Sequence, residues 1–125
     1  SQSAQLVGAY QAKANEQATL SVSSKLENGK VVLTTTLTKE GLAGLEVVMN
    51  YDESKLTLDN VIFDAGSTIT NFSTHDNGRL RIKTGTPYKL VFTPKVNLTN
   101  TAGLFYFVLS DAVDAAGNKI DLIID

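Results

Sequence analysis

The sequence predicts an all-β protein, an antiparallel two-sheet β-sandwich of about nine short strands. Two observations favour this fold class. Apolar and polar residues alternate over short runs rich in Thr, Val and Leu, which is typical of half-buried strands. Turn residues, chiefly Gly, Asn and Asp, interrupt these runs about every ten residues, a spacing typical of sandwiches. No stretch has the apolar spacing of a long amphipathic helix.

Length and composition limit the classes of protein to which the chain can belong. Its 125 residues fit one domain over residues 1–125, with residues 1–17 as an extended or loosely packed N-terminal segment. The net charge of −2 and the lack of a basic patch argue against a nucleic-acid partner. The absence of cysteine excludes disulfides, zinc–thiolate sites and thiol catalysis, and we expect no cofactor.

The sequence leaves the location of the protein open. No apolar run approaches the roughly 18 residues of a membrane-spanning helix. The N-terminal residues are polar and lack the charged-then-apolar start of a signal peptide. A removed leader, an excised domain and a whole cytosolic product all fit. We therefore expect either an extracellular or cell-surface protein or a virion component made in the cytoplasm.

The strand pattern recurs along the whole chain. We expect strands at residues 4–10, 18–23, 31–38, 42–51, 55–63, 68–74, 79–84, 88–93, 103–110 and 119–124. Residues 11–17 lack an apolar stripe and are predicted as a loop or a single turn. The second strand alternates Leu20 and Val22 with polar neighbours. Asn28 and Gly29 then tolerate the positive φ angles of a tight hairpin, so they join this strand to the next.

The third and fourth strands each place a row of apolar residues on one face. Along residues 31–38 this row is Val31, Leu33, Thr35 and Leu37. Along residues 42–51 it is Leu45, Val47, Met49 and Tyr51. The opposite face of residues 42–51 carries Glu46, Val48 and Asn50. In the next strand the alternation slips by one position at Asp59 and Asn60, which predicts a β-bulge.

The second half of the chain continues the pattern with further turns. Residues 75–78, His-Asp-Asn-Gly, predict a tight turn, and residues 114–118 predict another. Residues 103–110 are so dense in Leu, Phe and Val that we expect this strand to be buried on both faces. Lys89, Pro94 and Lys95 lie where they would protect an exposed sheet edge. Another edge is left open, which predicts self-assembly by strand addition.

Residues 44–56 resemble part of a known family. An apolar strand ends in Tyr51-Asp52, polar residues follow, and Leu56 opens the next strand toward a corner at Gly66. This order is similar to that of cohesin-type modules, and the resemblance extends over about residues 18–124. It implies a nine-stranded jelly-roll sandwich that binds a dockerin-like module through a sheet face. At one position the chain departs from the pattern, because Glu53 stands where the family often has proline.

The resemblance also indicates a candidate docking site. Gly44 and Glu46 match positions where the family often places polar docking residues, although Gly44 has no side chain. With Val48 and Asn50 they form a predicted partner-binding stripe. The alternative is an ordinary solvated sheet face with one exposed valine. Tyr10 and Tyr88 are predicted either at the rim of such an interface or as half-buried strand residues.

No arrangement of residues in the sequence predicts catalysis. His75, the only histidine, lies in a turn, and no nucleophile motif accompanies it. Glu46 and Asp52 are read as surface groups, not as an acid–base pair, and Asp52 is expected to cap its own backbone. We therefore predict that the protein is not an enzyme. Three oxygen-bearing residues of one turn form a weak calcium candidate, namely Asp111, Asp114 and Asn118.

Three functions are compatible with these observations. The first is a cohesin-like, non-catalytic protein-binding module. The second is a structural subunit of a virion, such as a decoration, head or tail protein, or of a surface layer, with assembly neighbours as partners. The third is a carbohydrate-binding module, which the absence of tryptophan disfavours because sugars stack on exposed aromatic rings.

Overall fold

The computed structural model confirms the predicted all-β class. It describes residues 15–39, 41–66 and 70–125, which fold into nine strands and contain no α-helix. A short 3₁₀ turn, η1 (Asp76–Gly78), joins β5 to β6. The predicted strand at residues 4–10, together with the candidate rim residue Tyr10, lies outside the described residues. The strands are β1 (Gln17–Glu27), β2 (Lys30–Leu37), β3 (Leu42–Tyr51), β4 (Leu56–Phe63), β5 (Thr70–His75), β6 (Arg79–Thr84), β7 (Tyr88–Pro94), β8 (Phe105–Asp114) and β9 (Lys119–Ile124).

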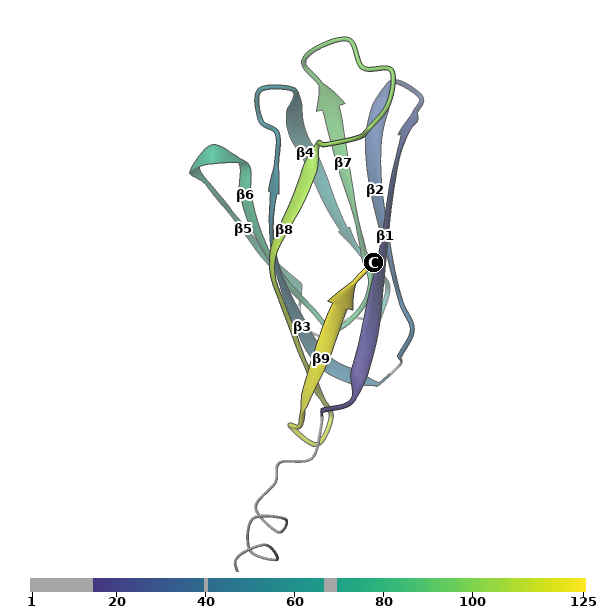
Figure 1. The fold of residues 1–125 in the computed structure, drawn as a ribbon, viewed down its shortest axis with the longest axis vertical. Helices are drawn as coiled ribbons and strands as arrows, with labels where there is room; N and C mark the ends of the chain where they lie inside the picture. Colours follow the sequence, from purple (N-terminus) through teal and green to yellow (C-terminus); the bar gives the residue numbers. More distant parts are fainter. Residues whose placement is uncertain (1–14, 40, 67–69) are drawn as a thin grey trace, which may run out of the picture.

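The strands form two layers that pack face to face (Figure 1). One layer has the order β4-β7-β2-β1 and the other has the order β8-β3-β6-β5. β9 joins the layers, because it pairs with β1 on one side and with β8 on the other. The β1–β9 pair is parallel, whereas the sequence analysis expected only antiparallel pairs. Alternation reveals which face of a strand is buried but not the direction of its neighbour, so it does not detect this pair.

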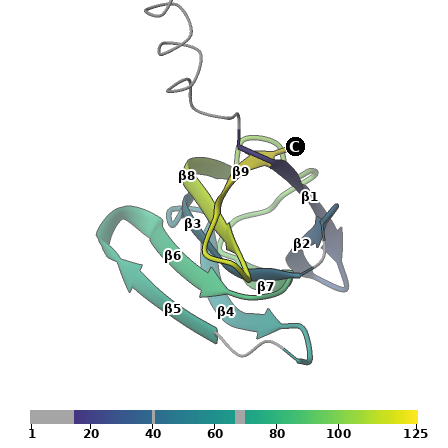
Figure 2. The same cartoon turned by 90° about the horizontal axis from the view of Figure 1, so that it is seen from below.

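The layers enclose the core between their inner faces, with β4 and β5 on the side opposite β9 (Figure 2). In β3 the inward row is Leu45, Val47 and Met49, all of which are buried as predicted. The rings of Tyr51, Phe92 and Phe105 extend the core, with successive centroids 5.1 and 5.3 Å apart. Because this packing fixes the inner face of β3, the alternate residues of β3 must lie on the outer face of the layer.

Turns form where the sequence predicts them. Asn28 and Gly29 have φ angles of 50° and 77° and join β1 to β2. At the end of η1, Gly78 has a φ angle of 71° and is buried against β3. A Cβ atom on Gly78 would lie 2.1 Å from the carbonyl oxygen of Tyr51, so only glycine fits this position.

The expectation that β8 is buried on both faces is wrong. Tyr106, Val108 and Leu109 are exposed, whereas Phe105 and Phe107 pack against the core. The described residues cover only one face of the strand, and a β-bulge opposite Val48 and Met49 adds an extra residue to it. The run is dense in apolar residues because both faces of this strand carry them: one face packs against the core and the other is exposed.

Two further expectations about individual residues are also wrong. Tyr88 is fully buried between the layers, where desolvation raises the pKa of its hydroxyl, so it is not a rim residue. Lys89 and Pro94 belong to β7, which pairs with β4 and β2 and is therefore an inner strand. The adjacent Lys95 donates hydrogen bonds to the carbonyl oxygens of Glu53 and Lys55, so it lies beside the start of the edge strand β4.

Candidate functional site

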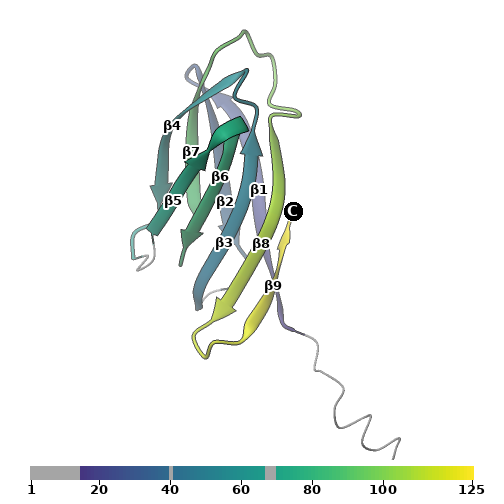
Figure 3. The ribbon, with the colours of Figure 1, turned by 90° about the vertical axis from the view of Figure 1, so that its left-hand side faces the viewer.

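The predicted site residues lie on the central strand of one layer. β3 is placed between β8 and β6 (Figure 3). Its outward row is Gly44, Glu46, Val48 and Asn50. Residues directly opposite one another in adjacent strands point to the same face. The outer face of this layer, called the β3 face below, consists of Gly44, Glu46, Val48 and Asn50 of β3, Tyr106, Val108, Leu109, Asp111 and Val113 of β8, Arg79, Arg81 and Lys83 of β6, and Asn71, Ser73 and His75 of β5.

Glu46 lies at the centre of the β3 face in a cluster of charges. Arg81 donates a hydrogen bond to its carboxylate, and Lys83 Nζ lies 3.8 Å from the other carboxylate oxygen. Asp111 lies opposite Glu46 on the β8 side. Exposed ion pairs of this kind add only about 0–1 kcal/mol to stability. Their main effect here is to hold an oriented carboxylate between two cations.

Val48 corrects the expectation of one exposed valine on this face. Its side chain is only 4% exposed, although it points away from the core. Its cross-strand neighbours are Leu109 in β8 and Arg81 in β6, which lie on either side of it. Two long side chains placed directly opposite cover the smaller valine between them. Val48 thus lies beneath the side chains that form the surface of the β3 face and is not itself a contact point at that surface.

The exposed apolar surface lies instead on β8. Tyr106 is 68% exposed, Leu109 is 49% exposed, and Val108 and Val113 are also exposed. Tyr106, Leu109 and Val113 lie opposite Asn50, Val48 and Gly44, so they share the outer face, with Asp111 between Leu109 and Val113. Val108 lies in the bulge next to Leu109, so the exposed apolar residues are neighbours over residues 106–109. Contiguous exposed apolar side chains mark interaction surfaces, and tyrosine is enriched at protein interfaces. The sequence contained this signal, because the run at residues 104–109 holds more apolar residues than one buried face needs.

Asn50 occupies the end of the face near the β5–β6 turn. Its Oδ1 atom accepts a hydrogen bond from Arg79 Nε at 2.7 Å. Beside it lies an open hollow of about 520 Å³, which Val48, His75 and Arg81 help to line. The hollow is polar and cationic in character, since the two arginines contribute their guanidinium groups.

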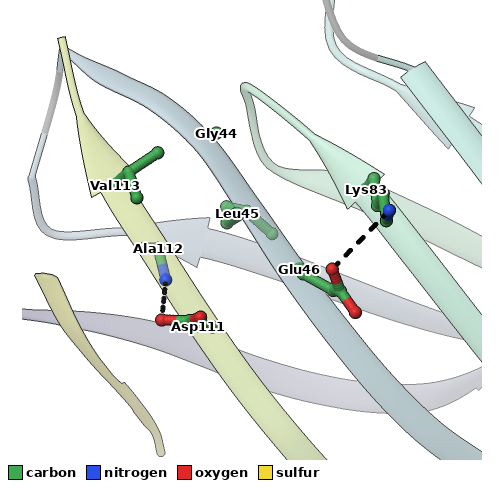
Figure 4. Close-up of a pocket in the computed structure, with 7 residues that line it drawn as sticks. All are labelled: Gly44, Leu45, Glu46, Lys83, Asp111, Ala112 and Val113. Carbon is green, nitrogen blue, oxygen red and sulfur yellow. Dashed lines mark hydrogen bonds and ion pairs between the residues drawn. The ribbon is translucent and has the colours of Figure 1, made fainter. Parts of the chain in front are cut away.

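Gly44 lies at the other end of the face, next to a second and smaller hollow of about 220 Å³ (Figure 4). Ala112 and Val113 of β8 line one side of it, while Glu46 and Lys83 lie on the other. The hollow is mostly apolar, and glycine adds no side chain to fill it. A side chain from another molecule therefore has space to enter at this point.

Charge and polarity divide the β3 face into two halves. The β8 half carries the apolar row, whereas β6 carries the cations Arg79, Arg81 and Lys83. Glu46 lies between the halves and compensates part of the cationic charge. Such a surface is complementary to a partner with an apolar row flanked by acidic groups.

The remaining candidates do not form a catalytic site in the described residues. His75 is exposed at the end of β5, with Nε2 3.2 Å from Ser73 Oγ, and no carboxylate of the described chain bonds its ring. Asp52 caps its own turn as predicted. The hydroxyl of Ser54, 2.5 Å away, is the main cause that lowers the pKa of this carboxyl group. Glu46 lies in the middle of β3, whereas Asp52 lies beyond the strand end, so they do not face each other across a cleft.

The calcium candidate divides between two locations. Asp111 belongs to the β3 face, opposite Glu46, and accepts a hydrogen bond from the backbone of Ala112. Asp114 lies in the β8–β9 turn, where it accepts bonds from the backbone and side-chain nitrogens of Asn118. Within the described ranges, no group of three or more His, Cys, Asp or Glu residues could hold a metal ion. Calcium binding stays a prediction.

The described part of the chain offers no helix with the length and apolar character that crossing a membrane requires.

Comparisons with known proteins relate this architecture to one class. No protein-family model and no curated protein matches the sequence. Among solved structures, the sixth cohesin of scaffoldin B from Acetivibrio cellulolyticus, solved with a Cel5 dockerin mutant, aligns with a TM-score of 0.69 and 15% identity. The alignment covers 87% of this chain and 94% of that one. The seventh ScaB type I cohesin from Pseudobacteroides cellulosolvens aligns with a TM-score of 0.68 and 12% identity, covering 88% of each chain.

A third match shows that the likeness is not limited to scaffoldins. The non-cellulosomal cohesin of the archaeon Archaeoglobus fulgidus aligns with a TM-score of 0.65 and 10% identity, covering 86% of each chain. The class that the fold defines is a nine-stranded β-sandwich. More narrowly, the chain has a cohesin-like fold, which confirms the resemblance seen in its sequence.

Proposed function

We propose that this chain is a non-catalytic module that binds a protein partner through the β3 face. The observation that carries the proposal is the exposed apolar row on β8 directly beside the oriented Glu46–Arg81–Lys83 cluster. Apolar contact area combined with oriented charge is what specific protein interfaces use. The fold supports the proposal, since cohesins of similar structure have been solved in complex with dockerins.

Within this proposal, the predicted stripe divides into different roles. Glu46 and Asn50 present oriented polar groups, Gly44 leaves the hollow that receives a partner side chain, and Val48 supports the surface from below. Tyr106 and Leu109, which the sequence analysis did not include, supply the exposed apolar contact. The partner class is a dockerin-like module, and an extracellular or cell-surface location goes with it. The virion, surface-layer and carbohydrate-binding alternatives stay predictions.

Point variants on the β3 face test the proposal. The probe is a panel of dockerin modules from the organism that encodes this chain, with affinity measured by calorimetry. We expect at least one dockerin to bind, and Leu109→Arg and Glu46→Arg each to weaken that binding by roughly tenfold or more, about 1.4 kcal/mol. Leu109→Arg inserts a charge into the apolar row, whereas Glu46→Arg leaves two cations, Arg81 and Lys83, without their shared carboxylate.

A matched control is Thr36→Arg, which adds the same charge to an exposed position of β2 in the other layer. We expect the affinity of this variant to equal that of the unchanged protein. If both face variants bind as tightly as Thr36→Arg, the β3 face is not the interface. If no dockerin binds at all, the proposed class of partner is wrong.

A further inference from the structure

The described sheet has two free edges, and they differ in how they are protected. In the strand order the two ends are β4 and β5. Natural proteins protect free edges with charges, prolines or bulges, since an unprotected edge pairs with other chains. β4 carries such protection: its register shifts between Leu58 and Asn60, and Asp59 within the shift forms an ion pair with Lys30 at 3.0 Å.

β5 carries none of these devices. Its sequence, Thr-Asn-Phe-Ser-Thr-His, contains no Lys, Arg, Asp, Glu, Pro or Gly. It pairs with β6 in unbroken register from Thr70 opposite Thr84 to His75 opposite Arg79. Figure 1 shows this strand at the margin of the molecule, and within the described residues only β6 pairs with it. Its other side therefore presents backbone groups without a strand partner in that part of the chain.

The side chains of β5 divide into two rows. Phe72 lies opposite the buried Ile82, so Thr70, Phe72 and Thr74 belong to the inner face of the layer. Phe72 is nevertheless 46% exposed, because nothing in the described chain covers it beyond the edge. With Thr74 it lines a hollow of about 420 Å³ that Leu58 and Val61 of β4 close from the other layer. An uncovered aromatic ring on an unprotected edge is a site for association.

The sequence of β5 is complementary to itself. In a dimer whose two-fold axis is perpendicular to the sheet, the inner faces of both copies lie on the same side of the sheet. Each inner residue of one β5 strand must then lie opposite an inner residue of the other, so the axis passes through a residue and not between two residues. Centred on Phe72, it places Phe72 against Phe72 of the second copy, Thr70 against Thr74, and Asn71 against Ser73. Aromatic, Thr–Thr and polar cross-strand pairs each stabilise a sheet, and no like charges oppose each other.

We propose that two copies of this chain associate through antiparallel pairing of their β5 edges, centred on Phe72. The β8-β3-β6-β5 layers of the two copies then form one continuous sheet, with main-chain hydrogen bonds between the strands. A six-residue strand buries less area than a standard stable interface, so we expect a weak dimer that forms only at high protein concentration.

This arrangement has a consequence for docking, which rests on the proposed function above. The two-fold axis keeps the outer faces of both copies on the same side of the sheet. The dimer therefore presents two β3 faces side by side, and a partner with two docking modules binds it with avidity that neither face has alone.

The test is sedimentation velocity of the chain over a concentration series from about 10 µM to about 1 mM, because a small interface associates weakly. We expect the weight-average mass to rise from monomer toward dimer. Phe72→Lys and Phe72→Glu should each remain monomeric, because like charges then meet at the two-fold axis. An equimolar mixture of these two variants should associate again, since lysine of one chain then lies opposite glutamate of the other.

A control variant and a variant-free measurement complete the design. Ile62→Lys adds the same charge at an exposed position of the β4 edge and should leave the association unchanged. Amide exchange of the unmodified chain should slow in β5 at the highest concentration, which needs no substitution. The proposal is overturned by a monomer at about 1 mM, by association of the Phe72→Lys variant alone, or by failure of the mixture to associate. The docking proposal is tested separately by measuring dockerin binding to the dilute, monomeric Phe72→Lys variant. If this variant binds dockerin, the docking proposal holds whether or not the chain dimerises.

Discussion

At the scale of single residues, Gly78 is the position that the backbone constrains most tightly. Its φ angle of 71° and the 2.1 Å separation between a Cβ atom and Tyr51 O exclude any side chain. We expect Gly78→Ala to lower the free energy of unfolding by at least about 2 kcal/mol, measured by urea denaturation. Gly103→Ala is the matched control, with a φ of 73° but no atom within 4 Å, and should cost only about 1 kcal/mol. Equal losses of unfolding free energy in both variants would show that the close approach to Tyr51 adds nothing to the cost of a side chain at position 78.

For single residues of the site, the sequence predicts on which face of the sheet a side chain lies, but not how far that side chain is exposed to solvent. Alternation along β3 placed Glu46 and Asn50 on the outer face correctly, because the buried row of the strand fixes the opposite row. It did not reveal that Val48 is covered, because the covering groups, Leu109 and Arg81, come from strands distant in sequence. The ion pairs of Glu46 were hidden for the same reason.

At the scale of elements, the β8–β9 turn links stability to pH. The backbone N–H of Asn118 is the main cause that lowers the pKa of Asp114 below its ordinary value of 3.8, aided by the Asn118 side chain and the backbone N–H of Ala116. A depressed pKa in the folded state means that the carboxylate stabilises the fold above this ordinary value. That contribution is lost as pH falls through the lower, folded-state pKa.

Removal of this carboxylate should therefore matter only where it is ionised. We expect Asp114→Ala to lower the melting temperature at about pH 6, and the difference from the unchanged protein to shrink at about pH 2.5. Thermal unfolding followed by circular dichroism measures both. Asp64→Ala, at an exposed aspartate outside this turn, controls for loss of a surface charge. A difference for Asp114→Ala that grows as pH falls would contradict the assigned role.

Another element, β8, shows why an apolar run in sequence does not fix burial. Its inward residues pack on the core as expected, but Tyr106 and Leu109 stay exposed, because no residue of the described chain covers the outer face of this strand. The alternation signal is weak where both faces are apolar, so periodicity alone favours a doubly buried strand. The apolar residues of the proposed docking surface are therefore visible in the sequence, but their density predicts a buried strand.

At the scale of the whole molecule, local pattern predicted the strands, turns and β4 bulge but not the order in which the strands pair. The parallel β1–β9 pair joins the two layers and makes β4 and β5 the free edges. The sequence pattern instead predicts edge protection at Lys89 and Pro94, which lie on an inner strand. Strand order depends on long-range contacts, and the resemblance to cohesins supplied the jelly-roll architecture that alternation does not contain.

The central claim is that a protein partner docks on the outer face of the β8-β3-β6-β5 layer. The most direct measurement maps backbone amide chemical shifts of the labelled chain on titration with the dockerin that binds it. We predict that the perturbed amides gather at residues 44–50, 79–83 and 106–113. Perturbations confined to β4, β7, β2 and β1, with the β3 face unchanged, would contradict the claim.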